Sequence, residues 1–102
     1  MWTSVFIFLQ VLATPEPQLT PEEVAEKMQL VERLYDSLDY EELVPVLMEV
    51  TESRGVDEDT LIRAYYLYGA VLAVMGATVE AEGPFRELLA LDPDFDPGDY
   101  EP

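Results

Sequence analysis

The sequence contains no cysteine and no histidine. Without cysteine, the chain has no disulfide, no thiolate metal ligand, no thiol nucleophile and no lipoprotein anchor. Without histidine, it lacks the commonest transition-metal ligand, the usual proton shuttle near neutral pH and the base of most nucleophilic triads. An enzyme built from this chain would depend on carboxylates, tyrosine, serine, threonine and a few cations.

Basic residues are also scarce, with 5 lysines and arginines against 22 acidic residues and a formal net charge of -17. They are scattered singly, at Lys27, Arg33, Arg54, Arg63 and Arg86. No stripe of positive charge can neutralise phosphates, and the overall field repels nucleic acids and anionic lipids. We therefore expect no nucleic-acid partner.

Long apolar runs are few. The 102-residue chain has the length of one small domain. Its most apolar stretch inside the chain is AYYLYGAVLAVMG at 64–76. A membrane-spanning helix needs about 20 apolar residues, so this stretch is too short to cross a bilayer. Because its apolar residues cover nearly all sides of a helix, neighbouring helices must bury it on more than one face.

The first residues, MWTSVFIFLQVLATPEPQLT, change abruptly from apolar to polar and proline-containing. The apolar run fits the core of a secretory signal at 1–13, cleaved before Thr14, although no positive charge precedes it. Residues 14–19 would then form an extended leader. Two alternatives remain: an apolar segment packed on the fold, and an uncleaved anchor. A cleaved signal predicts a periplasmic or secreted protein with no membrane span in the mature chain, and otherwise a cytoplasmic one.

The patterning of the remaining chain predicts four helices. TPEE at 20–23 predicts a helix start with Thr20 as N-cap, Pro21 at the first position and Glu23 closing a capping box. Apolar residues then recur at spacings of three and four until DSLD at 36–39. The other helices are predicted at about 40–53, 58–75 and from Thr78 to 91, with caps at the residues Asp39, Asp57 and Thr78.

Glycine and proline residues indicate where these helices end or bend. Gly55 and Gly76 suit helix C-termini, where a left-handed residue is favoured. Pro45 falls just past the first turn of the second helix, where we expect it to bend the helix or remove one hydrogen bond.

The spacing of the last two helices is specific. The pattern is Tyr65-x2-Tyr68-Gly69-x2-Leu72, then Ala81-x3-Phe85, then Pro93. It resembles the tetratricopeptide repeat, a helical hairpin with an aromatic, a glycine, an alanine and a proline at fixed offsets. In such a hairpin, Gly69 and Ala81 allow the two helices to approach closely, Phe85 fills the gap between them and Pro93 stops the second helix.

A weaker copy of the pattern lies 38 residues upstream. Its members Leu34, Leu43, Leu47 and Val50 match Leu72, Ala81, Phe85 and Leu88, while Val31 stands where Gly69 would be. The resemblance implies an all-α fold of two antiparallel helical hairpins stacked as a short tetratricopeptide-like α-solenoid at 20–93, followed by an acidic tail at 94–102. A plain four-helix bundle is the alternative.

The acidic clusters are not expected to be catalytic. They lie at 22–26, 41–42 and 57–59, in first helical turns, where the helix dipole favours anions. Asp92, Asp94 and Asp96 alternate like part of a calcium loop, but Pro97 occupies the place of the sharp-turn glycine. We therefore expect no catalytic residue, no metal and no cofactor.

Partner-binding residues are expected outside the core. Tyr65 and Tyr68 are predicted to pack in it, whereas Tyr66 faces elsewhere and joins Phe95 and Tyr100 of the tail as candidate contacts with a partner. Since two hairpins are fewer than a free-standing array needs, the open end of the stack should meet a protein partner or another copy. The sequence thus predicts a non-catalytic adaptor or scaffold subunit of an envelope or surface assembly. The alternative is an acidic inhibitor or chaperone-like cap on a basic partner surface.

Overall fold

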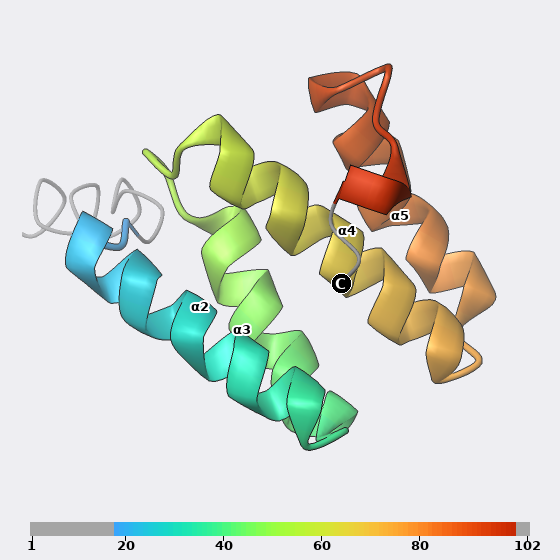
Figure 1. The fold of residues 1–102 in the computed structure, drawn as a ribbon, viewed down its shortest axis with the longest axis horizontal. Helices are drawn as coiled ribbons and strands as arrows, with labels where there is room; N and C mark the ends of the chain where they lie inside the picture. Colours follow the sequence, from blue (N-terminus) through green and yellow to red (C-terminus); the bar gives the residue numbers. More distant parts are fainter. Residues whose placement is uncertain (1–17, 100–102) are drawn as a thin grey trace, which may run out of the picture.

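The structure is a computed structural model that describes residues 18–99. Within these residues it contains four α-helices, namely α2 (Pro21–Asp36), α3 (Tyr40–Glu52), α4 (Glu58–Val74) and α5 (Thr78–Leu91), and a short 3-10 helix, η1 (Pro97–Asp99). Each α-helix packs on the next one along the chain (Figure 1). The predicted all-α class is confirmed. The predicted signal at 1–13 lies outside the described residues.

Helix α2 begins at a complete capping box, as the sequence predicts. The backbone N–H of Glu23 donates to Thr20 Oγ1 at 3.1 Å, and the backbone N–H of Thr20 donates to Glu23 Oε1 at 2.9 Å. Two donors that a helix start would leave unpaired are thereby satisfied.

Helix α4 begins at the predicted cap Asp57. Its carboxylate accepts the backbone N–H of Thr60 at 3.0 Å and the Thr60 hydroxyl at 2.7 Å. These hydrogen bonds, the side-chain one foremost, hold the pKa of Asp57 below its ordinary value of 3.8. The carboxylate form is therefore the one that stabilises the helix start.

We expect Asp57→Ala to lower the free energy of unfolding by about 1 kcal/mol at neutral pH, and Asp57→Asn by less, because asparagine also caps. Since the folded-state pKa is depressed, this stabilisation is present above pH 3.8 and is lost as the pH falls through the lower folded-state value. Urea unfolding of the three proteins at neutral pH and at about pH 2 checks this. An Asp57→Ala deficit that persists undiminished at low pH would contradict it.

The turn after α2 closes with two backbone hydrogen bonds. The N–H of Leu38 donates to the carbonyl of Tyr35 at 3.1 Å, and the N–H of Asp39 donates to the carbonyl of Leu34 at 2.9 Å. Leu38 itself has a φ of 62°, the left-handed conformation usually taken by glycine at this position of a Schellman motif.

The turn after α4 has the same geometry at the same place in the second hairpin. The N–H of Gly76 donates to the carbonyl of Ala73 at 3.0 Å, and the N–H of Ala77 to the carbonyl of Leu72 at 2.8 Å. Gly76 has a φ of 85°. Ala77 has φ -87° and ψ 62°, close to the -84° and 63° of Asp39. The two turns are thus offset by the 38 residues that separate the two copies of the sequence pattern.

Two predicted caps differ from the structure. Asp39 occupies the N-cap position of α3, but its side chain makes no capping hydrogen bond. The cap of α5 is Ala77 rather than Thr78, which is already the first helical residue, so that prediction is wrong. In both hairpins the residue that follows the left-handed turn residue occupies the N-cap position, and neither cap makes a side-chain hydrogen bond.

A proline lies inside the second helix of each hairpin. Pro45 is part of α3 and does not end it, although the carbonyl of Glu41 loses the N–H that would normally bond it four residues on. Pro84 lies inside α5 and is buried there. The sequence analysis identified only the first of these interruptions.

The core centres on α3, which contacts both α2 and α4. Leu43, Leu47 and Val50 of this helix are fully buried, at 0% exposure. α4 is also contacted on two sides, by α3 and α5, as expected. However, Val74, in the apolar stretch at 64–76, is 68% exposed. The most apolar helix is therefore not the most buried one.

Polar contacts join segments that are distant in sequence. Lys27 of α2 pairs with Glu49 of α3 at 3.0 Å, and Arg63 of α4 pairs with Glu32 of α2 at 2.8 Å. Both pairs are largely exposed, so each contributes at most about 1 kcal/mol. The first pair joins two helices that pack on each other, α2 and α3, and the second joins α2 to α4.

Candidate functional site

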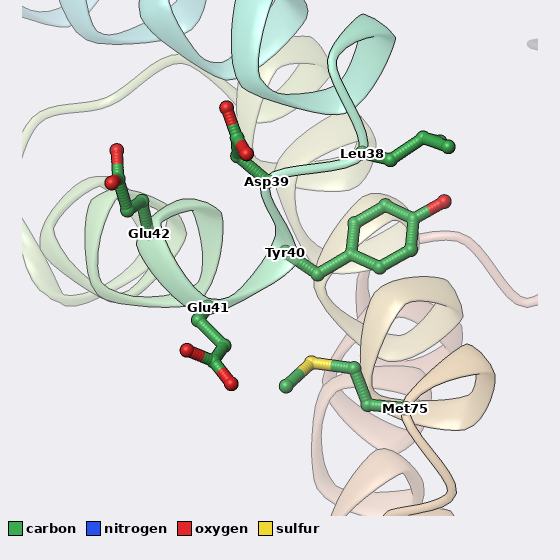
Figure 2. Close-up of a pocket in the computed structure, with 6 residues that line it drawn as sticks. All are labelled: Leu38, Asp39, Tyr40, Glu41, Glu42 and Met75. Carbon is green, nitrogen blue, oxygen red and sulfur yellow. The ribbon is translucent and has the colours of Figure 1, made fainter.

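A groove opens between the α2–α3 turn and the C-terminal end of α4 (Figure 2). Its volume is about 500 Å³, and it is lined by Leu38, Asp39, Tyr40, Glu41, Glu42 and Met75. Figure 2 shows the Tyr40 ring between the side chains of Leu38 and Met75. We call these six residues the hairpin groove. The groove forms because α3 and α4 pack on each other with the start of α3 near the end of α4.

The floor of the hairpin groove is apolar and open to solvent. Leu38 is 67% exposed and Met75 is 45% exposed. Tyr40 packs on Tyr35 with ring centroids 6.3 Å apart and the planes tilted by 52°. Together with Val74, these side chains place large apolar groups around one end of the molecule. Clustered exposure of this kind marks interaction sites more often than scattered single residues do.

Leu38 combines exposure with an unfavourable backbone conformation. A left-handed φ costs an L-residue with a side chain about 1–2 kcal/mol, whereas glycine adopts it freely. Gly76 occupies the equivalent position in the second hairpin. Stability alone would therefore favour glycine at residue 38 as well, and strained, exposed side chains of this kind are found preferentially at functional positions.

Replacing Leu38 with glycine is expected to raise the free energy of unfolding by about 0.5–1 kcal/mol, because the relief of strain exceeds the extra flexibility of glycine in the unfolded chain. The reverse change at the matched position, Gly76→Leu, should lower it by about 1 kcal/mol. A leucine Cβ there meets no atom within 4 Å, so the cost is backbone strain alone. Thermal unfolding checks both, and a lower melting temperature for Leu38→Gly would refute the strain.

The rim of the hairpin groove is acidic. Asp39, Glu41 and Glu42, the other three lining residues, have exposed side chains, and Figure 2 shows that of the three carboxylates only that of Glu41 points towards Met75. None of the five basic residues of the chain lines it. The local field therefore attracts cations and repels anions.

The sequence-predicted partner contacts lie elsewhere, and two of them contact each other. The rings of Tyr66 and Phe95 are 5.3 Å apart and both side chains are half-buried. Figure 1 shows the chain after α5 turning back, with η1 beside the helices. The beginning of the predicted acidic tail at 94–102 is thus packed onto α4 through Phe95. Tyr100 lies outside the described residues.

The residues of the repeat pattern lie where α4 meets α5. Gly69 is buried, and a Cβ built on it would come within 2.5 Å of the ring of Phe85. Ala81 is buried, at 3% exposure. Leu72 is half-buried, and α5 ends at Leu91, just before Pro93. The expected close approach of the two helices is present.

Tyr65 and Tyr68 are half-buried on α4, and Tyr68 packs against the core cluster, in accord with the expectation that these rings pack in the core. Burial raises the pKa of both hydroxyls, and the charge of Glu52 raises both further. Glu87 adds to the effect at Tyr65. A phenol whose pKa is raised is a weaker acid than usual.

Among residues 18–99, no group of three or more acidic side chains is arranged to hold a metal ion. Over the same residues, no helix combines the length and apolarity that a membrane crossing requires. The acidic clusters of α2, α3 and α4 lie in first helical turns as expected, except that Glu26 lies further along α2 and Asp57 is the N-cap of α4.

The fold and groove define a small all-helical protein with four sequentially packed α-helices in the described part of the chain. Comparison with models of protein families, with curated proteins and with solved structures finds no match to the chain. The likeness to the tetratricopeptide repeat therefore stays a prediction.

Proposed function

We propose that this protein is a non-catalytic protein-interaction module, a small helical adaptor that binds a partner through the hairpin groove. The observation that carries the proposal is Leu38. A large apolar side chain is held open to solvent in a backbone conformation that costs stability, beside the exposed Met75. Binding energy from burying these groups offsets what the fold loses by keeping them exposed.

The finer architecture belongs to the same proposal. We take the two hairpins as tetratricopeptide-like units, supported by the matched turns at Leu38 and Gly76 and by the Gly69–Phe85 contact. Units of this kind stack and bind partners without chemistry of their own. An exported adaptor serving an envelope or surface assembly agrees with the signal expected at 1–13.

Affinity capture from the cell that makes the protein tests the proposal. We expect the double variant Leu38→Ser, Met75→Ser to capture at least about tenfold less partner protein than the wild type. The matched control is Val79→Ser, which removes an equally exposed apolar residue of α5, 75% exposed and outside the groove. The same captured proteins with all three baits would overturn the assignment of the groove.

A second function, an acidic cap on a basic partner surface, is favoured by the net charge of -17. The two functions differ in their response to salt. Raising the ionic strength from about 0.1 M to about 1 M shortens the Debye length from about 10 Å to about 3 Å. A cap held by charge alone would lose its partner under that change, whereas an adaptor whose partner also buries the apolar groups of Leu38 and Met75 would keep a measurable part of its binding.

A further inference from the structure

We infer that the occupant of the hairpin groove is a segment of a partner protein in which arginine or lysine lies beside a large apolar residue. The inference rests on the proposed function and adds the chemistry of the ligand. It depends on the mixed lining of the groove, in which three residues are apolar or aromatic (Leu38, Tyr40 and Met75) and three are acidic (Asp39, Glu41 and Glu42).

The floor requires an apolar side chain. Leu38 and Met75 approach the groove from the two hairpins, with the Tyr40 ring between them (Figure 2). The unbranched thioether of Met75 adapts to apolar groups of different shape. A wholly polar segment would leave this exposed apolar surface uncovered and would gain little by binding.

The rim requires a cation. Asp39, Glu41 and Glu42 present three carboxylates within four consecutive residues, and no basic side chain of the chain lines the groove to neutralise them. Their electrostatic interaction with a basic residue strengthens as the apolar contact excludes water. Arginine fits best because its guanidinium pairs with carboxylates through two hydrogen bonds and also stacks on an aromatic face such as that of Tyr40.

Other occupants fit less well. A nucleic acid or an anionic membrane would meet the three carboxylates and a net charge of -17. A second copy of this chain seated groove to groove would bring two acidic rims together. A metal ion alone finds no suitable set of ligands among the described residues and would leave the apolar floor open.

The test measures binding of three short synthetic peptides with blocked ends to the full chain. The first peptide carries arginine and leucine side by side, the second has each arginine replaced by glutamine, and the third has each leucine replaced by serine. We expect the first to bind at least about tenfold tighter than either of the others. If the glutamine peptide binds as well as the first, or if none of the three binds, the inferred ligand chemistry is wrong.

Matched variants then separate the rim from overall charge. The double variant Glu41→Gln, Glu42→Gln should bind the arginine–leucine peptide several-fold more weakly and bind the glutamine peptide as the wild type does. Glu80→Gln with Glu82→Gln removes the same charge from exposed positions of α5 outside the groove, and should change neither. Equal effects of the two pairs would show that only the net charge matters.

Leu38→Gly separates a binding role from a structural one. The variant should bind the arginine–leucine peptide several-fold more weakly, while its melting temperature rises by a few degrees. A purely structural residue would move both quantities in the same direction. Failure of the peptide tests while the capture experiment still depends on Leu38 and Met75 would reject the ligand chemistry and leave the interaction module standing.

Discussion

Replacing Gly69 with leucine is expected to lower the free energy of unfolding by about 3 kcal/mol, the upper end of the cost of overpacking a core. A Cβ at this position would lie 2.5 Å from Phe85 Cε1 and 2.7 Å from both Cδ1 and Cζ of the same ring. Carbon atoms in contact are normally about 3.5–4 Å apart, so the ring or the whole of α5 has to move. Urea unfolding followed by circular dichroism measures the loss.

The smaller change Gly69→Ala distinguishes this contact from general helix preference. Alanine is favoured over glycine inside a helix by about 1 kcal/mol, so propensity alone predicts a gain. We expect a net loss of about 1–2 kcal/mol instead, because the clash outweighs that gain. Ala73 lies on the exposed side of the same helix and is the control. There, Ala73→Gly should cost about 0.5–1 kcal/mol, in accord with propensity.

Removing the ring should reverse the sign of the Gly69 effect. In a Phe85→Ala background the atoms that block the methyl group are absent, so Gly69→Ala should become neutral or stabilising. The double-mutant cycle measures this coupling directly. If Gly69→Ala costs the same with and without the Phe85 ring, the closeness of α4 and α5 does not depend on this pair.

The helices could be predicted because their signals are local. The capping box at Thr20 and the cap at Asp57 each involve residues three apart in the chain, so the sequence contains both partners. The cap at Thr78 was mispredicted because the backbone of the preceding tight turn, rather than a hydroxyl, sets the helix start. Residue preference predicts the N-cap position only where the preceding turn does not itself determine the residue at which the helix starts.

The depth of burial could not be predicted, because it depends on which faces of a helix the neighbouring helices cover. Hydropathy identified the helix containing Tyr65 and Tyr68 as the most apolar, yet these side chains are half-buried while α3 holds the most deeply buried residues. α3 has α2 on one side and α4 on the other, and α4 has α3 and the end helix α5. Composition indicates which residues of a helix are suited to burial, and the neighbouring helices determine which of them are actually buried.

The candidate site was missed because it combines residues 38–42 with Met75, which is distant in sequence. Leu38 and Met75 line one groove only once the helices have packed. One signal could have identified the position: the 38-residue offset aligns Leu38 with Gly76, so a leucine stands where the second copy has a helix-ending glycine. Tyr66 and Phe95 were selected as exposed aromatic residues, but the packing of the tail joins them to each other.

Leu47→Ala is expected to cost about 2–5 kcal/mol, the usual range for a buried leucine that leaves a cavity. Leu47 is 0% exposed and belongs to the one core cluster formed by α2, α3 and α4. Its neighbour Met48 is 38% exposed on the same helix, so Met48→Ala provides a control that should cost less than about 1 kcal/mol. Urea unfolding of the two variants under one set of conditions makes the comparison, and equal costs would place the core elsewhere.

The same variant connects the core to the groove. Tyr40, Glu41 and Glu42 form the first turn of α3, so the helix that Leu47 anchors also carries half of the groove lining. A domain of this size has a free energy of unfolding of about 5–10 kcal/mol, so losing several of these unfolds an appreciable fraction of the molecules near 37 °C. We therefore expect Leu47→Ala to reduce the amount of peptide bound in proportion to the unfolded fraction while the folded molecules keep their affinity. Titration at low temperature, where the variant is folded, should restore full binding, whereas Leu38→Gly should remain weak at every temperature because it changes the groove itself.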